Sequence, residues 1–157
     1  MWQRIQTVFL AVAAIALLVS LVLPIWSISS EASTHVLTPF YLLTDTPGDS
    51  GNLKVYQYFP FSLTAILTVA AATLALTSIT KYRKRVVQIK LGALNSLILV
   101  GVVGSSVYFA IRLIEEFQGG AYGWGFYLPM LAVICNLISN FFIRRDERLV
   151  RNSERLR

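Results

Sequence analysis

Four long apolar segments dominate the pattern of hydrophobic and polar positions along this chain. They occupy residues 5–26, 61–80, 91–114 and 124–143. Arg112 is the one charged residue within them. Each segment reaches or exceeds the roughly 20 residues that a helix needs to cross about 30 Å of hydrocarbon. The pattern predicts an all-α membrane protein, in which four transmembrane helices form one integral membrane domain over residues 1–157.

The long loop between the first two predicted helices, residues 27–60, contains stretches with strand character. Residues 34–43 and 53–59 are rich in β-branched and aromatic side chains, and the Pro, Gly and Asp residues of 46–52 are typical of a turn. This pattern predicts a small β-hairpin in the first external loop. We expect the hairpin to lie as a lid over the outer ends of the helices.

Composition supports the membrane assignment. Hydrophobic residues make up 55% of the chain and charged residues only 14%, and a soluble core of this size could not bury so much apolar surface. No catalytic, metal-binding or nucleotide-binding signature accompanies this composition, so the sequence predicts no cofactor and favours a protein that is not an enzyme. The single thiol, Cys135, lies in the fourth segment, where packing is its expected role.

Positive charge is distributed unevenly between the two sides of the predicted bundle. Of the fourteen Lys and Arg residues, twelve fall on one side, in the N-terminus, the loop between the second and third helices, and the tail at 144–157. Because cationic loops are retained in the cytoplasm, both termini are predicted to be cytoplasmic. The net charge of +6 then needs no nucleic acid, since attraction to the anionic inner leaflet explains it.

A cleaved signal peptide is the main alternative for the first apolar segment, because Arg4 and the apolar run after it can serve as the basic and the apolar region of such a peptide. The run is long for that role, and residues 27–29 make a poor cleavage site. A spanning helix is therefore the preferred interpretation.

Amide side chains inside the predicted bilayer are the first candidates for function, since polar groups there are costly unless they are paired. Asn95 on the third helix and Asn136 on the fourth are expected at similar depth, with Asn140 one turn further on. Hydrogen bonds between these amides would hold the two helices in register. A polar ligand site is the alternative.

A second polar group lies near the outer end of the third helix. Arg112 is followed by Glu115 and Glu116 at positions i+3 and i+4, which share one helical face. An ion pair at the membrane interface is the simpler interpretation. With the aromatic residues Trp26 and Trp124, the same charges are alternatively a candidate external pocket beneath the hairpin.

Small residues on the third helix allow close approach of another helix. Gly101 and Ser105, with Gly104 beside them, form such a surface. It fits packing within the bundle or the seam of a possible homodimer.

The tail is predicted to continue the fourth helix into the cytoplasm, because Glu147 and Arg151 have the i, i+4 spacing of a helical ion pair. Its leucines and arginines suit contact with anionic lipid or docking on a protein partner.

The two ends of the chain carry short motifs of a known family. The first is Gln3-Arg4-Ile5-Gln6-Thr7, and the second joins Asn140 to Arg145-Asp146-Glu147, Leu149-Val150-Arg151 and Arg155-Leu156-Arg157. In these motifs the chain resembles the membrane proteins of Bacteroidota catalogued as domain of unknown function 4293. The resemblance implies a four-helix protein of the bacterial inner membrane without an assigned activity.

The resemblance also directs attention to the cytoplasmic face. Candidate residues for binding a partner or lipid there are Arg4, Gln6, Asn140, Arg145, Asp146, Glu147, Arg151 and Arg155. Two functional hypotheses follow. The preferred one is a non-enzymatic accessory or scaffold protein that docks a larger membrane or cytoplasmic partner through this face. The alternative is a protein that binds or transports a small molecule or lipid through the external pocket.

Overall fold

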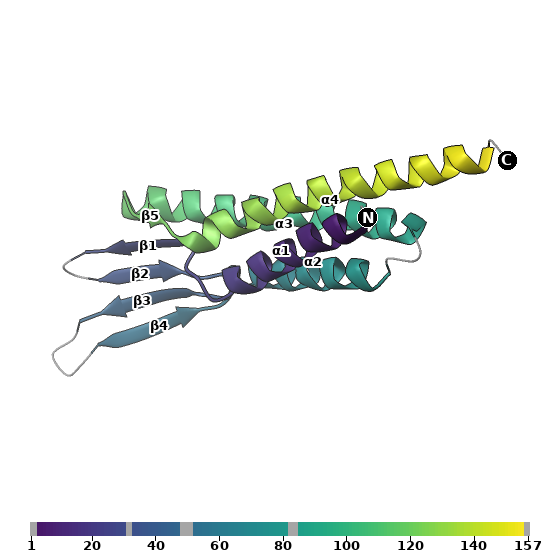
Figure 1. Cartoon of the computed structure of the whole chain (residues 1–157). Helices are drawn as coiled ribbons and strands as arrows, with labels where there is room; N and C mark the ends of the chain where they lie inside the picture. The colour runs from purple at the N-terminus through teal and green to yellow at the C-terminus, as the bar shows by residue number, and fades with distance from the viewer. Residues whose placement is uncertain (1–2, 31–32, 48–51, 82–84, 156–157) are drawn as a thin grey trace.

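Four helices and a small antiparallel sheet make up the protein in the computed structural model, which describes residues 3–30, 33–47, 52–81 and 85–155 (Figure 1). The helices are α1 (Gln3–Ser20), α2 (Ser62–Thr80), α3 (Arg85–Phe117) and α4 (Trp124–Arg155). The strands are β1 (Trp26–Ser29), β2 (Thr34–Leu37), β3 (Leu42–Thr46), β4 (Leu53–Gln57) and β5 (Ala121–Tyr122).

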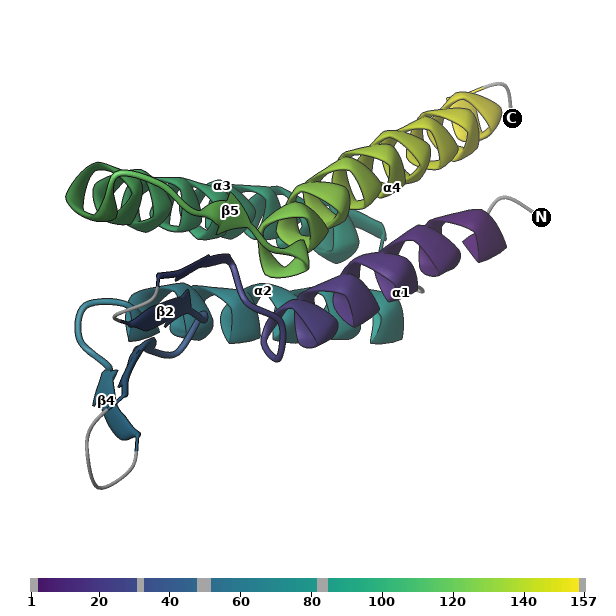
Figure 2. The same ribbon diagram turned by 90° about the vertical axis from the view of Figure 1, so that its left-hand side faces the viewer.

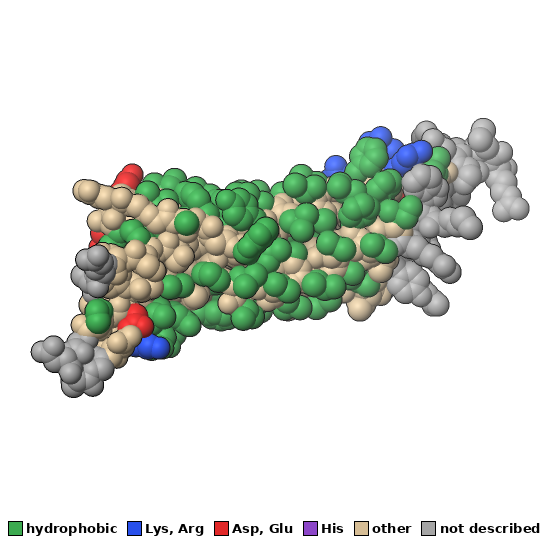
Figure 3. All heavy atoms as spheres, turned by 60° about the vertical axis from the view of Figure 1, so that its left-hand side comes forward, with side chains coloured by type: hydrophobic (Ala, Val, Ile, Leu, Met, Phe, Trp, Pro, Cys, Tyr) green, Lys and Arg blue, Asp and Glu red, His purple; other side chains and the backbone are tan. Residues whose placement is uncertain are grey.

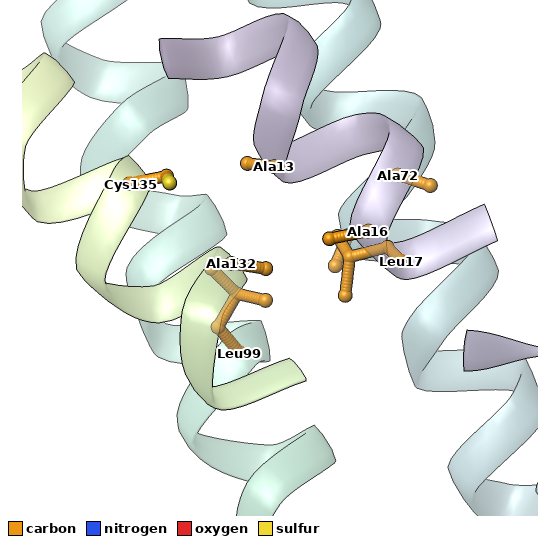
Figure 4. Close-up of a cluster of buried hydrophobic side chains, with 8 residues drawn as sticks. Ala13, Ala16, Leu17, Ala72, Leu99, Ala132 and Cys135 are labelled. Carbon is orange, nitrogen blue, oxygen red and sulfur yellow. The ribbon is translucent and has the colours of Figure 1, made fainter. Parts of the chain in front are cut away.

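The helices pack in a ring, with α1 against α2 and α4, and α3 against α2 and α4. Small side chains fill the centre, which brings the helix backbones close together. Figure 4 shows this core, formed by Ala13, Ala16, Leu17, Ala71, Ala72, Leu99, Ala132 and Cys135. The predicted four-helix bundle is therefore confirmed, and Cys135 is a packed core residue.

Three of the helical segments are long and apolar enough to cross a membrane: Ser62–Thr80, Val86–Phe117 and Trp124–Leu149. Hydrophobic side chains cover the middle of the bundle surface, and the charged side chains lie towards its two ends (Figure 3). The apolar part of α1, Ile5–Ser20, is shorter, at about 24 Å for a rise of 1.5 Å per residue.

The prediction that the first helix reaches residue 26 was wrong. The helix ends at Ser20, and Pro24 follows in the turn that leads to the sheet. The backbone beyond it makes sheet hydrogen bonds, since Ile25 N donates to Leu37 O at 2.8 Å. A proline disfavours helix in the residue before it, so the apolar run divides between a helix and a strand.

The third and fourth helices extend beyond their predicted apolar limits of 91–114 and 124–143. Charged residues end an apolar run without ending a helix, because Arg, Lys and Glu are good helix formers. The predicted helical continuation of the tail is confirmed as far as Arg155. This last part of α4 projects past the other helices at the end of the bundle where both termini lie (Figures 1 and 2). We call this the termini end, and the opposite end the sheet end.

The predicted hairpin is part of a five-stranded sheet with the order β4-β3-β2-β1-β5. Pairing of β3 with β4 agrees with the prediction. The prediction of a single strand over residues 34–43 was wrong. The chain turns at Thr38-Pro39-Phe40-Tyr41, and this turn separates β2 from β3. Thr38 N donates to Tyr41 O at 2.9 Å across this turn, and proline is favoured at its second position.

The connection between α3 and α4 supplies the edge strand β5, which pairs with β1. Gly120 makes this possible in two ways. Its φ of +107° is one that residues with a side chain rarely adopt, and a Cβ atom there would overlap the indole of Trp26. The sheet thus joins both loops at this end of the bundle.

The sheet lies past the outer ends of α1 and α2 and beside the last turns of α3 (Figure 1). Trp26, Leu37 and Leu42 of the sheet form a buried cluster with helix residues that include Phe109 and Leu113. Trp26 is fully buried, and its ring lies 6.1 Å from that of Phe117.

Candidate functional site

Buried amides join α3 to α4 in the termini half of the bundle. Asn95 Nδ2 donates to Asn136 Oδ1 at 3.2 Å, which is the interhelical contact expected from their positions. Asn136 is completely buried and Asn95 is 1% exposed. In a bilayer such hydrogen bonds average about 0.6 kcal/mol each, so this pair favours one register of the two helices.

Three neighbouring residues, Asn140, Gly92 and Ser96, make further hydrogen bonds here. Together with Asn95 and Asn136 they form what we call the amide cluster. Asn136 Nδ2 donates to Ser96 Oγ at 2.8 Å and to Gly92 O at 3.3 Å. Asn140 Nδ2 donates to the same two acceptors, at 3.3 Å and 3.1 Å. A Cβ atom at position 92 would overlap Asn140 Oδ1, so a glycine is needed for this close approach.

Sequence reasoning did not identify Gly92 and Ser96. Their i, i+4 spacing forms a small-residue surface on α3, and Asn95 lies between them. Such a surface beside an intramembrane amide is a signal for close, hydrogen-bonded helix packing that could have located the cluster.

Several buried polar atoms near this end make no hydrogen bond within the described part of the chain. They are Gln6 Nε2, Ser78 Oγ, Asn95 Oδ1 and Asn140 Oδ1. Gln6 lies inside the bundle, where its carbonyl accepts a hydrogen bond from Ser139 Oγ at 3.3 Å. A buried polar group without a partner costs about 1–3 kcal/mol, so these atoms lower the stability of the bundle.

The charged candidates at the termini end lie on the surface of α4. Arg145 is exposed, and Asp146 and Glu147 are half-buried. The side chains of Arg4, Arg151 and Arg155 lie outside the described residues. Gln6 and Asn140 are buried, whereas the charged candidates lie on the surface. Some candidate residues therefore belong to the bundle interior and the others to the projecting helix.

The external candidates lie in different surroundings. Trp26 is a core residue, whereas Trp124 is 73% exposed and has its ring edge against Tyr127. The Arg112 guanidinium lies 5.4 Å from the centre of the Tyr108 ring, a cation–π contact. Among the described residues no ion pair joins Arg112 to Glu115 or Glu116, and both carboxylates are exposed.

The small-residue surface on α3 mostly faces α2. A Cβ atom at Gly101 would lie 3.4 Å from Leu67 Cδ1, and Ser105 Oγ accepts a hydrogen bond from Thr64 Oγ1 at 3.1 Å. Gly104 differs, because nothing lies within 4 Å of its Cβ position. Two of these three residues therefore serve packing within the bundle.

The described residues include no group of three or more His, Cys, Asp or Glu side chains that could hold a metal ion. Their buried polar chemistry consists mainly of amides and hydroxyls, which donate and accept hydrogen bonds without changing charge near neutral pH.

Comparison with known proteins tests the family resemblance that the two terminal motifs indicate. No curated protein matches the chain. A family model described as "Domain of unknown function (DUF4293)" matches residues 2–156, nearly the whole chain, and so includes both motifs. The chain therefore belongs to the family described as Domain of unknown function (DUF4293).

Proposed function

We propose that this protein is a non-enzymatic accessory or scaffold protein of the bacterial inner membrane, which docks a larger protein partner through its cytoplasmic face. The observation that carries the proposal is the length of α4. Its 32 residues span about 48 Å at 1.5 Å per residue, against about 30 Å of hydrocarbon. The final turns of α4 project beyond the other helices (Figure 1).

Charge supports a cytoplasmic position for this projection. The short loops and tail that hold most of the Lys and Arg residues are at the termini end, and such segments are retained in the cytoplasm. The sheet end, with β1 to β5, is then external.

The projecting helix has the composition of a docking element. Residues 144–157 contain six arginines and three carboxylates, and Leu149 is 57% exposed among them. Apolar contact combined with guanidinium groups suits a partner surface that is acidic around an apolar patch. The amide cluster contributes rigidity, because it holds α4 to α3 inside the bundle, ahead of the projection.

A crosslinking experiment in native membranes tests this proposal. A photoreactive amino acid replaces Leu149 on the projection, and in a control it replaces Leu131, which is 44% exposed in the middle of α4. We expect one protein to be crosslinked in stoichiometric yield from position 149 and none from position 131. The variant Arg151→Gln with Arg155→Gln should abolish the crosslink, whereas Arg112→Gln at the sheet end should leave it unchanged.

Two results would contradict the proposal. One is a set of crosslinks to lipid alone from position 149. The other is a protein crosslink of equal yield in the double arginine variant, since docking would then not depend on the charged projection.

A further inference from the structure

A groove runs along the outer face of α4 in three adjoining parts, of which the first two lie between α3 and α4 and the third lies on α4 alone. The first has a volume of about 410 Å³ and is lined by Val100, Val103, Gly104, Met130, Val133 and Ile134. The second, of about 330 Å³, is lined by Ala93, Ser96, Leu137, Asn140, Phe141 and Arg144. The third, of about 320 Å³, is lined by Phe141, Arg144, Arg145, Arg148 and Leu149. We call the three together the α3/α4 groove.

The spacing of the lining residues shows that the three parts form one surface. On α4 they recur every three or four residues from Met130 to Leu149, which is a single helical face. The second and third parts share Phe141 and Arg144. Polarity changes along the groove, from wholly apolar side chains at the middle of the bundle to arginines at the termini end.

We propose that the α3/α4 groove binds one anionic glycerophospholipid, with the phosphate at Arg144 and Arg148 and an acyl chain along the apolar part. This site shares Arg144, Arg145, Arg148 and Leu149 with the docking element proposed above, but its test is separate, because the docking test changes Arg151 and Arg155. Charge complementarity selects the occupant. Guanidinium groups pair well with phosphate oxygens, and both arginines are exposed at the mouth of the groove.

The groove is long enough to hold the acyl chain of one leaflet. Arg144 and Met130 are fourteen residues apart on α4, or about 21 Å along the helix, whereas half of the hydrocarbon thickness is about 15 Å. A phosphate at the arginines thus places an acyl chain beside Val133 and Ile134. Gly104 leaves open space opposite them, which a side chain would fill.

Asn140 and Ser96 make the middle part of the groove polar. Asn140 is 8% exposed there. Ordinary contact of a bilayer with an apolar helix face does not supply the two arginines.

Native mass spectrometry of the purified full-length protein tests the site. The protein in mild detergent is titrated with phosphatidylglycerol, and in parallel with phosphatidylethanolamine and phosphatidylcholine. We expect one phosphatidylglycerol per chain to be retained, and the two zwitterionic lipids to bind much more weakly. The variant Arg144→Gln with Arg148→Gln should bind phosphatidylglycerol about 25-fold more weakly, at about fivefold for each charge removed.

A second variant tests the apolar part. Gly104→Leu places a side chain in the groove from an open Cβ position, and it should reduce the retained phosphatidylglycerol. Each groove variant has a control in which the same type of substitution is made away from the groove. Lys81→Gln removes a charge at the same end of the bundle, at the residue that follows α2, and Thr73→Leu adds the same side chain to an exposed position of α2. Both controls should retain the lipid.

Four results would overturn the proposal. They are no retained lipid, equal retention of phosphatidylglycerol and phosphatidylethanolamine, unchanged binding in both groove variants, and a dimer that Gly104→Leu dissociates. The last would assign the groove to a second copy of the chain.

Discussion

Substitution of Gly92 by Ala tests the close packing of α3 against α4. The added Cβ would overlap Asn140 Oδ1 and lie 2.8 Å from Asn140 Cγ. Asn140 therefore has to move, and its hydrogen bonds to Gly92 O and Ser96 Oγ are lost or lengthened. Because Asn140 is buried between the helices, the alternative is a separation of α3 from α4.

The size of the effect follows from three contributions. Two interhelical hydrogen bonds account for about 1.2 kcal/mol at about 0.6 kcal/mol each. Overpacking in a closely packed site adds about 1–3 kcal/mol. Ala has a higher helix propensity than Gly, which offsets about 1 kcal/mol of this destabilisation. We expect Gly92→Ala to lower the free energy of unfolding by about 1–3 kcal/mol.

Unfolding in mixed micelles by increasing dodecyl sulfate, followed by circular dichroism, measures this change. Gly104→Ala is the matched control on the same helix, and it should be neutral or stabilising by up to about 1 kcal/mol, because nothing lies near its Cβ position. Combining Gly92→Ala with Asn140→Ala should remove the overlap, giving a coupling energy above about 1 kcal/mol. Equal stability of Gly92→Ala and Gly104→Ala would refute the packing described for the amide cluster.

Three further predictions use the same unfolding measurement. Asn136→Ala loses three hydrogen bonds and should destabilise the bundle by about 2 kcal/mol, whereas a change below about 0.5 kcal/mol would mean that the amides are not paired. Gly120→Ala should lower the free energy of unfolding by about 1–3 kcal/mol, because Ala rarely adopts the positive φ of this position. The added Cβ should also displace the indole of Trp26 and shift its fluorescence emission; an unchanged emission spectrum would contradict the contact between Gly120 and Trp26. Trp26→Ala should cost about 3–5 kcal/mol as a core truncation, while Trp124→Ala, at an exposed position, should cost less than about 0.5 kcal/mol; similar costs would show that Trp26 is not in the core.

Sequence reasoning succeeded where the signal was local. The apolar segments located all four helices, and the i, i+4 spacing in the tail indicated that α4 continues. The contact of Asn95 with Asn136 followed from counting residues inward from the helix ends, because two antiparallel neighbours of similar length bring equal depths together.

Sequence reasoning failed where a partner from elsewhere in the chain decides the outcome. Trp26 is as apolar as the helix before it, yet it pairs with β2 and β5. Ala121 and Tyr122 form a strand of only two residues, which no pattern of alternation can reveal. Pro39 was a local signal for the turn between β2 and β3 that the strand prediction overlooked.

The sequence by itself determined the class of the protein, its four helices and its asymmetry of charge, because hydrophobicity, helix length and charge are properties of single segments. Only the tertiary structure decided that Trp26 is a core residue, that Gly92 and Ser96 belong to the amide cluster, and that one face of α3 and α4 forms a groove ending in arginines. Each of these depends on which side chains meet across two elements. That information lies in the relative rotation and depth of the helices, which packing determines and no single segment specifies.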